Sequence, residues 1–482
     1  MANIVLSASV RLTNTSKIDL PVVYVEGKGV LSSFCRYLKV KRRMSISWKE
    51  KAALSIRLLL DYAEANENNF RTPQEMFVEF SESLFTGTID ENGEDLTRLR
   101  WKSRSVSHSN SLISHVTNFS EWLYDNTSEE SELLNPLVKA TPHERICNLA
   151  AYHQRKSRAF LKHTFNDLSA NRKAEFVHEV KGKKNPSNNE EVKKFDGDIA
   201  IKLMSEGFWK KSVAPEAPEQ LNVRNVLITM LMHYGGLRVS EPFHLFLEDV
   251  YQDPDDPDLA LIKVNHPILG DAPESWRKSH PSRRNDNRQA YLKSKFGLKD
   301  RLSSTSKKYH SGWKSAGFKS FYVYWFPRSA GVIWFKLFKY YIVHQRVHSD
   351  DCNNPFIFTN QYGHPASLSV FMTSHNKAVT KLGYKPKKSN GLTPHGHRHW
   401  YGDTLSDLGV DPLIIKKMMH HSSIESQGTY RATARDKEIR SALTKVEQGT
   451  CLDTTVRSSP LSFGFEDVDP LGLFSGSNPL LT

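Results

Sequence analysis

The stretch from Gly391 to Tyr430 constrains the fold of this chain most, because helix signals and chemically active side chains coincide there. Pro394 suits the first turn of a helix, where its missing N–H is not needed. His395 and Arg398 follow with a three-residue spacing, which places both on one helix face, roughly 5–6 Å apart at Cβ. The sequence therefore predicts a helix that presents an imidazole and a guanidinium together.

A second helix pattern follows a Gly-Val-Asp-Pro turn at 409–412. The apolar residues between Leu413 and Met419 predict its buried side. This helix ends in a pair of histidines, and the second of them, His421, precedes Tyr430 by nine residues.

These side chains favour one chemistry, the attack of a phenol on a phosphodiester. A free tyrosine has a pKa of ~10, so a neighbouring group must take its proton. The transition state gains negative charge on the non-bridging oxygens, and arginine binds two such oxygens at once while it stays protonated. The mechanism therefore needs a second arginine and an acid for the leaving oxygen.

The second arginine follows an apolar helix pattern, in the sequence GGLRVSE at 235–241. With these residues the chain resembles the tyrosine recombinase (phage integrase) family. GGLRVSE resembles its first arginine box, HGHR at 395–398 its His-x-x-Arg box, and HHSSIESQGTY at 420–430 its final histidine-to-tyrosine segment. Order and spacing agree over roughly 195–435. Sequences such as HPILGDAP and YWFP also resemble the gamma-mobile-trio recombinases within that family.

The resemblance implies a mainly α fold with a small β-sheet. It consists of a helical, SAM-like core-binding N-terminal domain and a tyrosine-recombinase catalytic domain. The expected domains are a polar lead-in at 1–20, a helical DNA clamp at 21–140, a basic helical connector and linker at 141–194, the catalytic domain at 195–445 and a flexible acidic tail at 446–482.

The resemblance also implies a catalytic set that consists of Arg238, Lys314, His395, Arg398, His421 and Tyr430. In this set Tyr430 attacks the phosphate and leaves a 3′-phosphotyrosyl link. The two arginines and His421 hold the non-bridging oxygens, while His395 accepts the phenolic proton. Glu241 is expected to orient the Arg238 side chain without contacting the phosphate itself.

The general acid is expected to be Lys314, in a strand–turn–strand region that starts with the strand pattern 259–264. Lys319 competes with it, and a different strand assignment selects Lys263 or Lys308. The segment before Lys314 is longer than the compact hairpin usual in the family, which indicates an insertion.

Five histidines in the two boxes raise a metal-site alternative: His395, His397, His399, His420 and His421. Residues at i, i+2 and i+4 of a helix do not converge on one point, and no cysteine is near. We therefore expect no metal and no cofactor. The family usually has an apolar residue at position 397 and a glycine at position 420.

Charge is concentrated in the expected insertion. The chain has a net charge of +13, and between Arg277 and Lys319 thirteen lysines and arginines face two aspartates. This pattern predicts a segment that follows a DNA backbone. The residues expected to contact DNA are Arg283, Arg284 and Arg288 in this segment, with Lys102 and Arg104 in the N-terminal domain.

The expected partner is double-stranded DNA with a specific recombination site, bound by a homo-tetramer, with accessory proteins left open. The N-terminus lacks a signal-peptide pattern and no run of 18 apolar residues occurs, so we expect a cytoplasmic, nucleoid-associated protein without a membrane partner. The function so implied is that of a site-specific integrase of a mobile element. The alternatives are a type IB topoisomerase-like enzyme and a non-catalytic DNA-binding protein of the same fold.

Overall fold

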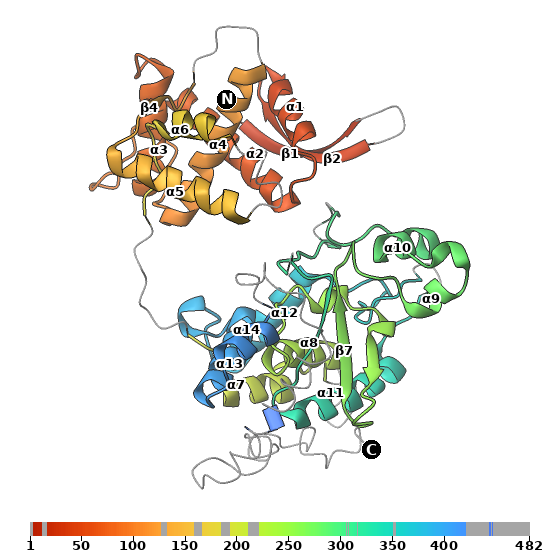
Figure 1. The fold of residues 1–482 in the computed structure, drawn as a ribbon. Helices are drawn as coiled ribbons and strands as arrows, with labels where there is room; N and C mark the ends of the chain where they lie inside the picture. The colour runs from red at the N-terminus through yellow and green to blue at the C-terminus, as the bar shows by residue number, and fades with distance from the viewer. Residues whose placement is uncertain are drawn as a thin grey trace. The chain divides into compact units, whose positions relative to one another are not determined.

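The computed structural model divides into two compact units, residues 1–189 and residues 190–482 (Figure 1). Within them the structure describes residues 3–11, 17–126, 133–158, 166–184, 193–210, 221–304, 306, 308–315, 317–349, 353–420, 443–444 and 446. Unit 1 combines a β-hairpin with a helical bundle, and unit 2 is mainly helical around a small antiparallel sheet.

Unit 1 starts with a hairpin in which β1 (Asn3–Arg11) pairs antiparallel with β2 (Lys17–Val25), and β3 (Gly29–Val30) adds a short third strand. The expectation of a polar lead-in at 1–20 was wrong. Val5, Ala8 and Val10 of β1 are partly buried and pack against the core of the unit. β-branched residues such as valine favour a half-buried strand.

The bundle of unit 1 contains α1 (Ser32–Val40), α2 (Ile46–Ala65), α3 (Pro73–Thr86) and α4 (Val106–Asn126). Helix α3 starts after Thr72, whose hydroxyl caps it by accepting a hydrogen bond from the Glu75 N–H at 3.2 Å. Phe34, Phe77 and Phe80 are completely buried and lie at the centre of this bundle.

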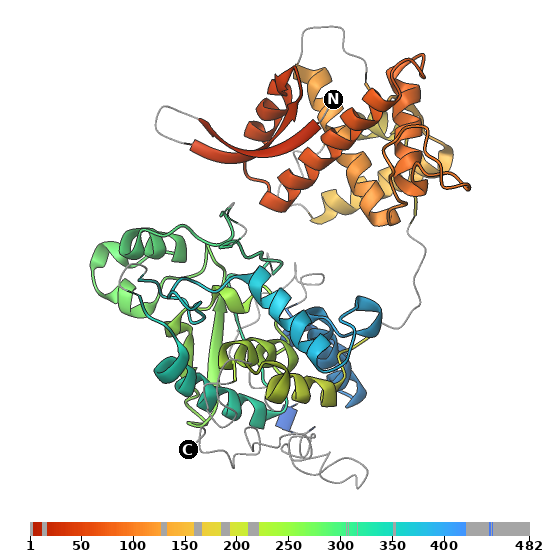
Figure 2. The same cartoon turned by 180° about the vertical axis from the view of Figure 1, so that it is seen from behind.

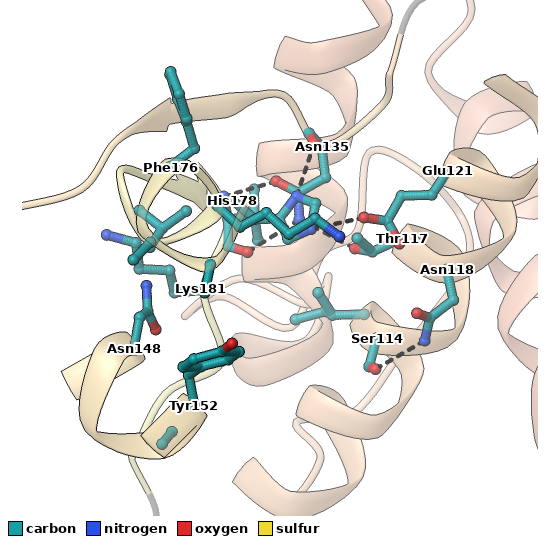
Figure 3. A pocket seen from close by; sticks show the side chains of 18 of the residues that line it. Ser114, Thr117, Asn118, Glu121, Asn135, Asn148, Tyr152, Phe176, His178 and Lys181 are labelled. Atoms are coloured by element: carbon teal, nitrogen blue, oxygen red, sulfur yellow. Dashed lines mark hydrogen bonds and ion pairs between the residues drawn. The ribbon is translucent and has the colours of Figure 1, made fainter. Parts of the chain in front are cut away.

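Residues 141–189 of the expected connector belong to unit 1. They include α5 (Pro142–Arg158), α6 (Asp167–Ala174) and β5 (Phe176–His178). The preceding strand, β4 (Leu137–Lys139), pairs antiparallel with β5. A cavity of about 1000 Å³ separates α5 and α6 from α4. Figure 3 shows His178 and Glu121 on its wall, where they form an ion pair at 3.1 Å.

Unit 2 is built around α8 (Val223–His233), whose residues are buried on almost every side. Figure 1 and Figure 2 show the ribbon of this unit from two sides. The larger elements are α7 (Gly197–Lys202), α8 (Val223–His233), α11 (Arg328–Tyr340), α12 (Leu368–Lys381), α13 (Pro394–Asp407) and α14 (Pro412–Met418). Two π-helical turns, η2 (Leu203–Gly207) and η7 (Tyr341–Gln345), extend α7 and α11.

The sheet of unit 2 has the order β6-β7-β8, with antiparallel neighbours: β6 (Val250–Gln252), β7 (Ala260–Asn265) and β8 (Ser320–Tyr322). The strand predicted at 259–264 is therefore present. Between β7 and β8 the insertion folds into α9 (Glu274–Lys278), a 3-10 turn η6 (Pro281–Arg283) and α10 (Arg288–Phe296). Short 3-10 turns also occur at η4 (Pro242–His244), η5 (Leu247–Asp249) and η9 (Lys388–Asn390).

The insertion is fixed to unit 2 by two buried arginines. Arg288 is 1% exposed and forms an ion pair with Asp249. Arg301 donates hydrogen bonds to the carbonyls of Tyr309, Phe243 and Ala366 at 2.6–3.0 Å. These bonds tie the insertion to two distant parts of unit 2.

None of the helices in the described part of the chain combines the length and the apolar character that a membrane crossing needs.

Candidate active site

Arg238 lies just beyond the end of α8, where the chain turns at two glycines. Gly236 has φ +65°, a left-handed conformation that glycine adopts without steric cost. Glu241 is completely buried and holds Arg238 twice: its carboxylate accepts from the Arg238 backbone N–H at 2.7 Å and from Nη1 at 3.1 Å. The Ser315 hydroxyl accepts a further bond from Nη1 at 2.6 Å. The guanidinium therefore has a fixed direction.

Arg398 lies on α13, which starts at Pro394 as predicted. Its side chain is 2% exposed and donates hydrogen bonds to the carbonyls of Gly236 and Met419. Burial lowers the pKa of Arg398 to about 10, the carboxylate of Glu241 opposes this shift, and the charge of Arg238 adds to it. Arg398 therefore stays protonated at neutral pH, and its charge interacts with that of Arg238.

His395 lies on α13 one turn before Arg398 and is exposed. Partial burial lowers its pKa to about 4, and the charges of His399, Arg398 and Lys314 contribute to the shift. The imidazole is therefore neutral at pH 7 and can accept a proton.

Lys314 is exposed, and its charge acts on His395. Its neighbours in the sequence, Ser311 and Ser315, are completely buried. The competitor Lys319 forms an ion pair with Asp271 at 2.8 Å. Of these two lysines, only Lys314 is adjacent to a residue that contacts Arg238.

The end of the second predicted helix approaches the same place. His420 has φ +54°, is 2% exposed and stacks on Phe321 with ring centroids 3.6 Å apart. A left-handed backbone explains why a glycine suits this position in the family. The carbonyl of His420 faces Nη2 of Arg238 at 3.5 Å. His421 and Tyr430 lie outside the described residues.

His397, which the sequence left without a role, is completely buried beside Arg398 on α13. It hydrogen-bonds His233 of α8 and His375 of α12, each at 3.0 Å, and stacks on Phe195 at 3.9 Å. The polar residue is accommodated because both of its ring nitrogens have partners. The sequence alone does not reveal this role of His397, because its partners His233 and His375 are remote from it in the chain.

The metal-site alternative gains no support in the part of the chain that the structure describes, where no group of three histidine, cysteine or acidic residues could hold a metal ion.

The residues expected to contact DNA fall into different environments. Lys102 and Arg284 are exposed, whereas Arg104 is half-buried against the Trp101 ring at 4.9 Å. Arg283 lies over Trp276 at 3.8 Å and stays partly accessible.

The expectation for Arg288 was wrong. Both of its terminal nitrogens bond Asp249, at 2.8 and 2.9 Å, and Nη2 also bonds the carbonyl of His244. Arg288 is 1% exposed and its charge is paired with the carboxylate of Asp249, so it is a core residue of unit 2 and not one of the exposed cations of the insertion.

Comparisons with known proteins give one family match and several structural similarities. Residues 334–437 match the model of the phage integrase family. A search of the curated proteins finds no match. Among solved structures, the XerH site-specific recombinase bound to a palindromic difH substrate is similar with a TM-score of 0.43 and 11% identity, over 87% of this chain and 84% of that one. The Tn1549 transposon integrase in complex with transposon right end DNA gives a TM-score of 0.32 and 14% identity, over 80% and 98%.

The matched segment contains α13 with its His-x-x-Arg box, α14 and the histidine-to-tyrosine sequence. Over residues 334–437 the chain thus matches the phage integrase family, the tyrosine recombinases.

Proposed function

We propose that the protein is a site-specific tyrosine recombinase, the integrase of a mobile element, which cuts and rejoins duplex DNA through a 3′-phosphotyrosyl intermediate. The observation that carries this proposal is the convergence of Arg238 and Arg398. One follows α8 and the other lies on α13, yet both contact the segment Met419–His420, which leads directly to His421. Two fixed guanidinium groups at one point suit a single phosphate.

The chemistry follows from the charges of these residues. The Tyr430 phenol oxygen forms a bond to phosphorus while the bond from phosphorus to the 5′-oxygen breaks. Neutral His395 takes the phenolic proton, and Lys314 gives a proton to the departing 5′-oxygen. Arg238 and Arg398, with a hydrogen bond from His421, stabilise the negative charge on the non-bridging oxygens. The bond energy is kept in the phosphotyrosine, so this route uses neither ATP nor a metal ion.

The remaining assignments concern the DNA. We assign unit 1, with Lys102 and Arg104, to clamping the duplex, and the exposed cations of the insertion to its backbone. The reaction joins two duplexes at specific sites, which requires a tetramer on DNA. The cytoplasm is the proposed location.

The test uses nicked suicide duplexes that tile the DNA on both sides of the gene. Wild-type protein should form a covalent adduct on a subset of them, whereas Tyr430→Phe should form none and still bind the same duplexes. Tyr401→Phe is the matched control. The Tyr401 hydroxyl is buried against the carbonyl of Tyr324, so removing it leaves the nucleophile in place. An undiminished adduct in Tyr430→Phe would refute the assignment.

The same duplexes, together with a supercoiled plasmid, distinguish the two alternative functions. A type IB topoisomerase-like enzyme relaxes any supercoiled plasmid without a partner site. A non-catalytic DNA-binding protein binds the duplexes and forms no adduct with any of them.

A further inference from the structure

The segment that carries Lys314 is attached directly to the segment that carries Arg238. The Ser311 hydroxyl donates to the Ser240 carbonyl at 2.9 Å, and His244 Nε2 lies 3.1 Å from the Gly312 carbonyl. Because a carbonyl only accepts, His244 donates in this bond. Residues 311–315 are thus held against 238–244 along their length, although they lie at the end of a long insertion.

Ser315 makes the contact nearest to the guanidinium. Its hydroxyl donates to Glu241 Oε1 at 2.8 Å and accepts from Arg238 Nη1 at 2.6 Å. Since the carboxylate can only accept and the guanidinium can only donate, both directions are fixed. Ser315 is completely buried, so water does not compete for these two bonds.

From this geometry we infer that Ser315 is a positioning residue that sets Lys314 relative to Arg238. Arg238 itself does not depend on the serine. Without the hydroxyl it keeps its backbone and Nη1 bonds to Glu241. The segment with Lys314, in contrast, loses both hydrogen bonds that the Ser315 side chain makes to Glu241 and Arg238. Removal of the hydroxyl should therefore impair the protonation of the leaving oxygen while the charge stabilisation by arginine stays intact.

This inference rests on the proposed function, and its test depends on the leaving group. We compare single-turnover cleavage of a selected suicide duplex with its analogue in which sulfur replaces the 5′-bridging oxygen. A thiolate departs without a proton, so this analogue does not need the general acid. Lys314→Ala should cleave the oxygen substrate about 10²–10⁴-fold more slowly and the sulfur substrate near the wild-type rate.

Ser315→Ala should repeat this pattern with a smaller amplitude. We expect about 10- to 100-fold slower cleavage with oxygen, because a small displacement of a catalytic group is costly, and a rate within about threefold of wild type with sulfur. Ser311→Ala is the matched control. It removes an equally buried hydroxyl from the same segment, but one that contacts only a backbone carbonyl. It should cleave both substrates within about threefold of wild type.

The possible outcomes are distinct. An equal deficit of Ser315→Ala on both substrates, or no deficit at all, overturns the positioning role. An effect of Ser311→Ala equal to that of Ser315→Ala overturns it as well, because general loosening of the segment then explains both. If wild-type protein forms no adduct with either substrate, the proposed function fails instead. Thermal unfolding of the variants confirms that the compared proteins are folded.

Discussion

Acid should destabilise unit 2 strongly, because it buries neutral histidines. His233, His244 and His375 are at most 2% exposed, and burial lowers the pKa of each to about 3. His397 is completely buried, and burial lowers its pKa well below the ordinary value. In the unfolded chain each of these groups titrates near pH 6.5.

The sign and size of the effect follow from linkage. As the pH falls below about 6.5 the unfolded state binds protons that the folded state does not, so stability present above that pH is lost toward the folded pKa near 3. At pH 5.5 each histidine costs about 1.4 kcal/mol relative to pH 8, or about 6 kcal/mol for four. Near that pH the free energy of unfolding should fall by about 5 kcal/mol per pH unit. Domains are typically stable by only about 5–15 kcal/mol, so unit 2 should approach unfolding.

The assay is urea unfolding between pH 8 and pH 5, followed by circular dichroism and tryptophan fluorescence. His375→Gln can keep one hydrogen bond to His397 and should reduce the slope by about 1.4 kcal/mol per pH unit. His364→Gln replaces an exposed histidine of the same unit and should leave the slope unchanged. A slope below about 1.4 kcal/mol per pH unit in the wild-type protein would refute the reasoning, because fewer than one proton would then be taken up.

Four further predictions concern charge, backbone and metal. Arg283→Gln with Arg284→Gln should flatten the slope of log affinity against log salt by up to about two units on a random-sequence duplex; an unchanged slope would exclude phosphate contacts there. Arg288→Gln should leave that slope unchanged but lower the free energy of unfolding by about 3–5 kcal/mol, because the buried carboxylate of Asp249 then has lost its ionic partner. A flattened slope for this variant would show that Arg288 contacts DNA. Gly236→Ala should lower the free energy of unfolding in urea by at least about 2 kcal/mol, because the residue has a left-handed backbone and an added Cβ would lie 2.6 Å from the Tyr401 ring. An unchanged unfolding midpoint would show that the turn adjusts to the added methyl group. Strand cleavage should persist in EDTA; complete loss that magnesium or zinc restores would contradict the proposed chemistry.

Local sequence signals predicted the helices well. Helix α2, Ile46–Ala65, has apolar residues at helical spacing along its sequence, and these form its buried side. Helix α3 starts after Thr72 because the threonine side chain caps it. The box at 395–398 lies on the predicted helix after Pro394. In each case the residues that determine the structure are neighbours in the chain, so a short window contains the information.

Counting charges along the sequence gave a wrong prediction for Arg288, because its ionic partner is distant in the chain. Arg288 is one of thirteen basic residues in its segment, and nothing nearby marks it as buried. Its partner Asp249 lies 39 residues earlier in the chain, before strand β7 begins. Arg301 is likewise held by carbonyls from distant segments. A basic segment thus predicts a polyanion partner as a whole, but not which of its cations are free to contact one.

The same limit applies within the candidate site. The sequence supplied Arg238, Glu241 and Arg398 because each belongs to a box. It could not supply Ser315, because its two partners lie more than 70 residues earlier in the chain. It also could not predict that His397 would be satisfied by two other histidines, which only the packing of α8, α12 and α13 brings together.

The charges of the assembled site fit the proposed reaction. Arg238, Arg398 and Lys314 contribute three positive charges, Glu241 contributes one negative charge, and His395 is neutral at pH 7. In the proposed reaction this surplus of two positive charges rises to three when His395 accepts the phenolic proton, as the phosphorane gains its second negative charge. A resting phosphodiester carries only one, so the site complements the transition state better than the bound substrate. Glu241 contributes to this balance, because without its negative charge the partly exposed guanidinium of Arg238 and the buried guanidinium of Arg398 would repel each other more strongly.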